Sequence, residues 1–123
     1  MKKALIIEDN EDNMRLITVI LRKNGYITMG AENGRKGIDM AVREKPDFII
    51  LDIQLPDMNG TDVLKEIRTS EMLREMPVIA MTSHAMSGDR ERLLSAGCSG
   101  YIEKPIDPYS VIDQIKSITG EKG

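Results

Sequence analysis

The chain alternates between two hydrophobic patterns along its whole length. Short, nearly continuous apolar runs at 4–7, 48–51 and 78–81 are bounded by charged or turn residues, which is typical of buried parallel strands. Two more polar runs, at 26–29 and 101–102, suit edge strands or strand ends. Between the runs, apolar residues recur with helical spacing. The helical sets are Met14, Ile17 and Leu21; Ile38, Ala41 and Val42; Val63, Leu64 and Ile67; Leu93 and Leu94; and Val111, Ile112, Ile115 and Ile118. The pattern predicts five strand–helix pairs.

Turn-forming residues separate these segments and support the same boundaries. They are Gly25, Asn33-Gly34, Pro46, Asn59-Gly60, Pro77, Gly97 and Pro108. Gly37 is an exception, because it falls inside the second predicted helix, where glycine costs about 1 kcal/mol relative to alanine. Close packing of that helix would explain it. Alternating strands and helices predict an α/β fold, a doubly wound parallel sheet covered on both faces.

Composition limits the range of functions. A chain of 123 residues suits one domain over residues 1–123, with no room for an output domain. The single cysteine, Cys98, excludes an internal disulfide, so we expect the protein to be cytoplasmic. We expect Cys98 itself to be a small buried hydrophobic residue. A net charge of -3 and 3% aromatic residues disfavour nucleic-acid partners. The apolar run that follows Lys3 is too short for a signal peptide or membrane span.

Polar residues that can carry chemistry stand where the predicted strands end. Glu8-Asp9 follows the first strand, Asp52 the third and Thr82-Ser83 the fourth, and Lys104 comes shortly after the fifth. Ligands in doubly wound sheets bind at the carboxyl ends of the strands. We therefore expect these residues to converge at one edge of the sheet.

Three neighbouring carboxylates would repel one another by ~4 kcal/mol per close pair at an effective dielectric constant near 20, so the site needs a cation. Oxygen ligands favour Mg²⁺, with Mn²⁺ as a substitute. Asp9, Asp52 and a backbone carbonyl near Gln54 would bind it, with Glu8 acting through water. Zinc is disfavoured, because His84 is the only histidine. Capping of the first helix by Asp9 or Asn10 is compatible with metal binding.

Asp52 is the best candidate nucleophile of the three acids. It follows the most apolar strand and is therefore held on a rigid element. An ionised aspartate beside Mg²⁺ can attack phosphorus, because the metal reduces the repulsion between the carboxylate and the phosphoryl oxygens. Lys104 would supply a second cation for the phosphoryl group, and Thr82 a hydroxyl donor. A surface lysine and a strand-end cap remain the alternatives for these two residues.

Four segments carry a resemblance to a known family. They are Ile6 to Asn10, Ile50 to Gly60, Met81 to Ala85 and Gly97 to Pro105. In their order and spacing, the chain resembles the CheY-like receiver domains of bacterial response regulators over essentially its whole length. The resemblance implies a flavodoxin-like sheet in the order 2-1-3-4-5. It also implies phosphoryl transfer from a phosphohistidine of a sensor kinase or phosphotransfer protein to Asp52, with Mg²⁺ required, and a cis peptide bond between Lys104 and Pro105.

The resemblance further implies a conformational switch. The hydroxyl of Thr82 moves toward the phosphoryl group and Tyr101 turns inward, which alters the surface of helix 4, strand 5 and helix 5 for a downstream protein partner. A half-buried packing role is the alternative for Tyr101. Gln54 and His84 lie beside the site and would influence how long the phosphate lasts. Kinase docking would use the first helix, with Asn13, Met14 and Ile17 as candidates; Ile17 also fits the core.

Other functions fit less well. A haloacid dehalogenase phosphatase would need a second aspartate where Gln54 stands, and a flavodoxin would need a phosphate-binding loop where acidic residues follow Glu8. We therefore expect a phosphoacceptor signalling protein rather than an enzyme. This protein would assist its own phosphorylation and dephosphorylation. It would be a single-domain regulator, acting through protein contacts or in a phosphorelay; a receiver excised from a hybrid histidine kinase is the alternative.

Overall fold

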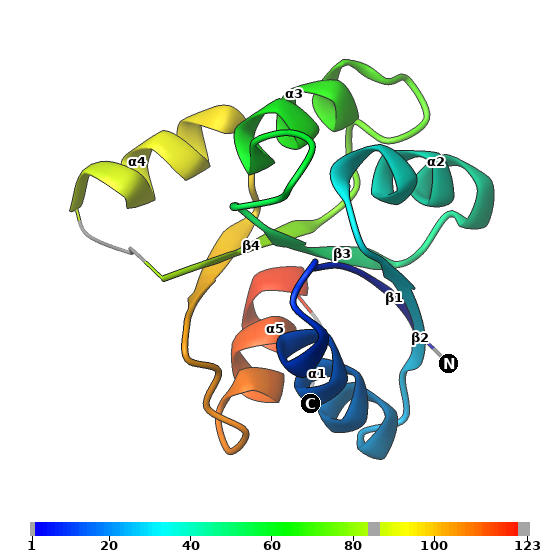
Figure 1. Cartoon of the computed structure of the whole chain (residues 1–123), viewed down its shortest axis with the longest axis vertical. Helices are drawn as coiled ribbons and strands as arrows, with labels where there is room; N and C mark the ends of the chain where they lie inside the picture. Colours follow the sequence, from blue (N-terminus) through cyan, green and yellow to red (C-terminus); the bar gives the residue numbers. More distant parts are fainter. Residues whose placement is uncertain (1, 84–86, 121–123) are drawn as a thin grey trace.

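The computed structural model describes residues 2–83 and 87–120, and it contains five strands that alternate with five helices (Figure 1). The strands are β1 (Lys3–Ile7), β2 (Ile27–Ala31), β3 (Phe48–Asp52), β4 (Val78–Thr82) and β5 (Gly100–Glu103). The helices are α1 (Glu11–Lys23), α2 (Gly34–Glu44), α3 (Gly60–Thr69), α4 (Ser87–Ala96) and α5 (Val111–Thr119). Within the described residues, none of these helices has the length and apolar character that a membrane span requires.

The strands form one parallel sheet in the order β2-β1-β3-β4-β5, which confirms the predicted α/β fold and strand order. In the register of the sheet, Leu5 lies between Met29 of β2 and Ile49 of β3. The two polar strands, β2 and β5, occupy the edges as predicted. Strand β2 begins at Ile27, one residue later than the apolar run, and continues to Ala31.

Helices cover both faces of the sheet. Helices α2, α3 and α4 lie on one face, and α1 and α5 on the other (Figure 1). Successive residues of a strand point to opposite faces, so Leu5 and Ile7 belong to the core under α2 and α3, whereas Ala4 and Ile6 pack with α1 and α5. Burial on both faces explains why these strands read as continuous apolar runs.

Most apolar positions expected at helical spacing are buried or half-buried, but two are exposed. Val42 is 36% and Leu94 45% exposed. Each follows directly on a buried residue, Ala41 or Leu93, and lies at the margin of the apolar stripe of its helix. Ile17 is completely buried, so its assignment to the core is confirmed and it offers no docking surface.

Gly37 permits close contact between a helix and the sheet. A Cβ atom at this position of α2 would overlap the Ile7 side chain on β1. The helix axis therefore lies closer to the sheet than any other residue would allow, which confirms the packing explanation for Gly37. Cys98 is likewise buried within the same core, as predicted.

Candidate functional site

Three carboxyl groups meet at the carboxyl edge of the sheet. Glu8 and Asp9 follow β1, and Asp52 is the last residue of β3. One carboxylate oxygen from each residue lies within 4.8 Å of the others. Glu8 and Asp52 are buried, whereas Asp9 is exposed. The adjacent, parallel strands β1 and β3 thus produce the predicted convergence of acids.

The residue that caps α1 is not one of the three acids of the cluster. Asn10 is the N-cap residue, and its Oδ1 accepts a hydrogen bond from the Asn13 amide at 2.9 Å. The Asn10 amide in turn donates to Glu8 Oε2 at 3.2 Å. Asn10, rather than Asp9, therefore caps the helix, and the Asp9 carboxylate remains near Glu8 and Asp52.

Lys104 supplies a cation to this cluster from the loop after β5. Its Nζ lies 3.2 Å from Asp52 Oδ1 and 3.2 Å from Glu8 Oε1. The Lys104 amide donates to the carbonyl oxygen of Thr82 at 2.8 Å, which joins the loop to the end of β4. The Lys104–Pro105 peptide bond is cis, as the resemblance implied.

The surroundings of Glu8 shift its pKa. Its burial, together with a hydrogen bond to Asp52 and the charge of that residue, raises the pKa of Glu8 to about 7. The Asn10 amide and Lys104 act in the opposite direction. Although Lys104 Nζ is near Glu8 Oε1, this buried oxygen has no hydrogen-bond donor among the described residues. Such an oxygen, beside two further carboxylates, fits a bound cation.

Two other predicted residues border the cluster. Thr82 is buried at the end of β4, next to β3 in the sheet. The Gln54 amide donates to Asp52 Oδ1 at 3.1 Å, and the Gln54 side chain is exposed. Gln54 also forms an antiparallel bridge with Asn59 across the loop between β3 and α3. His84 lies outside the described residues.

Tyr101 lies on the edge strand β5, half-buried and away from the acids. The guanidinium carbon of Arg90 on α4 lies 5.4 Å from the centre of its ring, which is within cation–π range. Both residues line a groove of about 540 Å³ between α4, β5 and α5, together with Leu94, Gln114 and Ile118. Arg90 could not be recognised from the sequence, because its contact depends on how α4 packs beside β5.

A second residue that the sequence analysis did not identify is Asp57, which follows Asp52 by five positions. Its carboxylate accepts hydrogen bonds from the Gly34 and Arg35 amides at 2.8 and 3.0 Å. One signal was present in the sequence, since the first turn of α2 has no acidic residue of its own.

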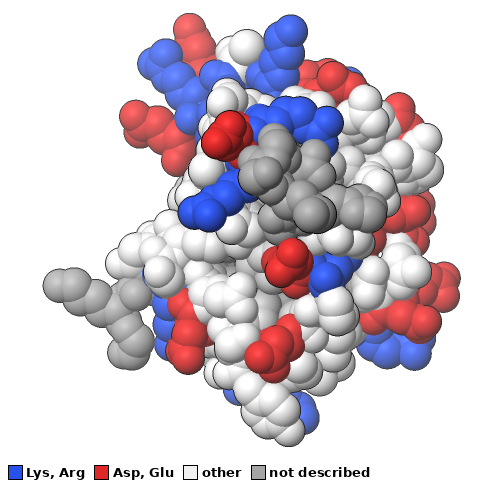
Figure 2. All heavy atoms as spheres, turned by 90° about the vertical axis from the view of Figure 1, so that its left-hand side faces the viewer, with Lys and Arg blue, Asp and Glu red and all other residues white. Residues whose placement is uncertain are grey.

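On the side of the molecule shown in Figure 2, acidic and basic side chains are intermingled around uncharged surface.

Comparisons with known proteins agree with this geometry. The family model described as the response regulator receiver domain matches residues 4–116. The polar-differentiation response regulator DivK of Brucella anthropi is 43% identical over 120 residues, which cover 98% of each chain.

Solved structures show the same fold. The chemotaxis response regulator CheY4 of Vibrio cholerae superposes with a TM-score of 0.91 at 23% identity, over 96% of this chain and 98% of that chain. The receiver domain of the sensor histidine kinase PA1611 of Pseudomonas aeruginosa, which was solved with a magnesium ion coordinated in its active-site cleft, is 34% identical. Its TM-score is 0.88, and the match covers 97% of this chain and 98% of that chain.

The family match excludes the phosphatase and flavodoxin interpretations, because it covers nearly the whole chain. The acidic cluster at the ends of β1 and β3 is the acidic pocket of this receiver domain and is typical of a magnesium site in the family. The chain belongs to the response regulator receiver domain family and is a phosphoacceptor protein of two-component signalling.

Proposed function

We propose that Asp52 accepts the phosphoryl group and that Lys104, Thr82 and a metal ion assist the transfer. The observation that carries this proposal is the position of Lys104 Nζ, 3.2 Å from Asp52 Oδ1 within a cluster of three carboxyl groups. Asp52 is the buried strand-end acid that combines a cationic partner with a place on a rigid strand. A rigid strand holds the nucleophile in place, and the neighbouring cation can stabilise the anionic phosphoryl group that Asp52 would carry.

The transfer requires one bond to form and one to break. A carboxylate oxygen of Asp52 attacks the phosphorus of a phosphohistidine on the partner protein. The phosphorus–nitrogen bond breaks, its electron pair remains on the imidazole nitrogen, and the imidazole takes up a proton. Lys104 then pairs with a phosphoryl oxygen, and the Thr82 hydroxyl donates a hydrogen bond to another.

The proposed metal is Mg²⁺, with Mn²⁺ as a substitute. Asp9, Asp52 and the backbone carbonyl of Gln54 would bind it directly, and Glu8 through water. The bound ion would reduce the repulsion between the Asp52 carboxylate and the incoming phosphoryl oxygens. The buried Glu8 Oε1 has no hydrogen-bond donor in the described part of the chain and shares the nearby Lys104 ammonium with Asp52, which supports a further cation here. The magnesium ion of the PA1611 receiver domain gives further support.

We also propose that phosphorylation alters the surface formed by α4, β5 and α5. Thr82 and Tyr101 are the proposed switch residues, and the groove beside Tyr101 is the proposed contact for a downstream protein. Movement of the Tyr101 ring would change its contact with Arg90 and hence the shape of that groove. Gln54 and His84 are proposed to influence the lifetime of the phosphate.

The histidine kinase is the partner class that the family implies, with a phosphotransfer protein as the alternative donor. We propose that residues 1–123 form one receiver domain that works in the cytoplasm, where it controls protein partners or relays the phosphate. The match to the response regulator DivK over 98% of both chains supports this role.

Incubation with phosphoramidate and Mg²⁺, followed by intact mass spectrometry, tests the proposal. We expect the wild type to gain one phosphoryl mass that hydroxylamine removes, as it does from acyl phosphates. Asp52→Asn should gain none, whereas Asp62→Asn, a control at an exposed acid of α3, should behave as the wild type does. Equal phosphorylation of Asp52→Asn and wild type would overturn the assignment.

A further inference from the structure

The loop between β3 and α3 is fixed at its base by backbone contacts. The Gly60 amide donates to the Ile53 carbonyl at 2.8 Å, and Gln54 and Asn59 form a bridge. A side chain on Gly60 would collide with the Ile53 backbone, so the two ends of the loop are in direct contact. The base of the loop therefore keeps a defined shape immediately beside Asp52.

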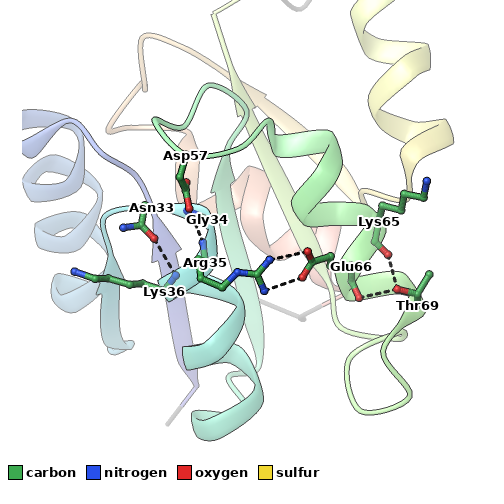
Figure 3. A network of polar contacts seen from close by, with 8 residues as sticks. All are labelled: Asn33, Gly34, Arg35, Lys36, Asp57, Lys65, Glu66 and Thr69. Atoms are coloured by element: carbon green, nitrogen blue, oxygen red, sulfur yellow. Dashed lines mark hydrogen bonds and ion pairs between the residues drawn. The ribbon is translucent and has the colours of Figure 1, made fainter.

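The far end of the loop is attached to a different element. Asp57 Oδ1 accepts from the Gly34 amide at 2.8 Å and Oδ2 from the Arg35 amide at 3.0 Å, both in the first turn of α2 (Figure 3). These two hydrogen bonds lower the pKa of Asp57, so the carboxylate is ionised where the helix dipole favours negative charge. Asp57 thus provides the acidic group that the first turn of α2 lacks.

Packing and an ion pair reinforce this attachment. Met58 fills the space that a side chain on Gly34 would need. The Arg35 guanidinium, from the residue whose amide binds Asp57, forms a bidentate pair with Glu66 of α3 at 3.0 and 2.8 Å (Figure 3). The loop, the start of α2 and the middle of α3 are therefore joined in one connected network.

We propose that Asp57 is a positioning residue for the metal site. This inference rests on the proposed function, in which the Gln54 carbonyl binds Mg²⁺. Gln54 is held at the base of the loop by its bridge with Asn59, and Asp57, three residues after Gln54, holds the same loop against α2, so the two attachments together set the location of that carbonyl. Outer contacts that orient metal ligands commonly account for roughly 10- to 100-fold in metal affinity.

Direct titration of the unphosphorylated protein with Mg²⁺ by isothermal calorimetry tests the inference. We expect Asp57→Ala to bind Mg²⁺ about tenfold more weakly, the low end of that range, because Asp57 acts through the backbone. Asp57→Asn, which keeps one acceptor oxygen, should lie between Asp57→Ala and the wild type. Circular dichroism shows whether each variant is folded, and Asp57→Asn provides the test if Asp57→Ala is not.

Asn33→Ala is the matched control. The Asn33 side chain accepts from the Lys36 amide in the same first turn of α2. Within the described residues it has no hydrogen bond to the loop, so its removal weakens the helix start alone. If Asp57 acts merely as a helix cap, Asn33→Ala and Asp57→Ala should lose stability alike and both keep wild-type Mg²⁺ affinity. That result would overturn the inference and leave the proposed function intact. A wild type that binds no Mg²⁺ would instead overturn the proposed function, and this inference with it.

Discussion

Lys104 Nζ lies 3.2 Å from Asp52 Oδ1, and the two side chains are only 16% and 6% exposed. The same ammonium group lies 3.2 Å from Glu8 Oε1. A single lysine is therefore shared by two buried carboxyl groups at the edge of the sheet. With Asp9 beside them, these acids outnumber the lysine, so an incoming phosphoryl anion needs both the lysine and the positive charge of a bound metal ion.

Replacing Lys104 with methionine should slow phosphorylation of Asp52. The variant keeps most of the side-chain volume but loses the charge that faces the developing phosphoryl anion. Loss of one such group typically costs about 100-fold in rate. Phosphorylation by phosphoramidate, followed by mass spectrometry over time, measures the effect. Lys116→Met on α5 is the control and should retain the wild-type rate; a Lys104→Met rate equal to it would contradict the proposed role.

Glu8 should make stability depend on pH when no metal is present. Folding raises the pKa of Glu8 from 4.5 to about 7, so the folded protein holds this proton more tightly than the unfolded chain. The contribution of Glu8 to the free energy of unfolding is therefore largest below pH 4.5. It falls by up to a few kcal/mol as the pH rises to about 7, and then levels off.

Urea unfolding in EDTA at several pH values between 5 and 8 measures this effect. Glu8→Gln, which cannot ionise, should lack the decrease, and saturating Mg²⁺ should reduce it in the wild type. Asp62→Asn, at an exposed position, controls for a general change in charge. Parallel pH profiles for Glu8→Gln and wild type would show that Glu8 is not the group responsible.

Gly37→Ala should destabilise the fold, although alanine is the better helix former. The new methyl group would overlap the Ile7 side chain, and overpacking of a core typically costs about 1–3 kcal/mol, against a gain of about 1 kcal/mol in helix propensity. Combining Gly37→Ala with Ile7→Ala should cost less than the sum of the two single changes, because the overlap is relieved. Thermal and urea unfolding provide the comparison. A single Gly37→Ala variant more stable than the wild type would show that the helix moves away freely.

The sequence predicted the fold well because its strands are buried on both faces. Runs such as Phe48–Asp52 need no tertiary information to be recognised, and the acids that end them converge because parallel strands end at one edge. Contacts between distant loops and helices were not predictable in this way. Asp57 and Gly34 are 23 residues apart, and their hydrogen bond depends on the conformation of a loop that has no periodic pattern.

Side-chain packing at the margins of helices was also hidden from the pattern. Leu94 shares helical spacing with Leu93, yet it lies in the groove beside Tyr101 rather than in the core. A one-residue rotation about the helix axis is about 100°, which is enough to move a side chain from the core to the surface. The pattern gives the face of a helix but not the width of the buried stripe.

Tyr101 provides a direct test of the proposed switch. Shifting a two-state domain almost completely requires about 5.5 kcal/mol of differential stabilisation, and we expect the phosphoryl contacts with Lys104 and Thr82 to supply much of it. Phosphorylation should therefore change the amide NMR resonances of α4, β5 and α5 in the wild type. In Tyr101→Ala, Asp52 should still be phosphorylated, but the changes around Arg90 and Gln114 should be much smaller, because the ring that contacts Arg90 is gone. Tyr109→Ala is the matched control, since that ring is 96% exposed and should not affect the response. Equal resonance changes in the Tyr101→Ala and Tyr109→Ala variants would place the switch elsewhere in the domain.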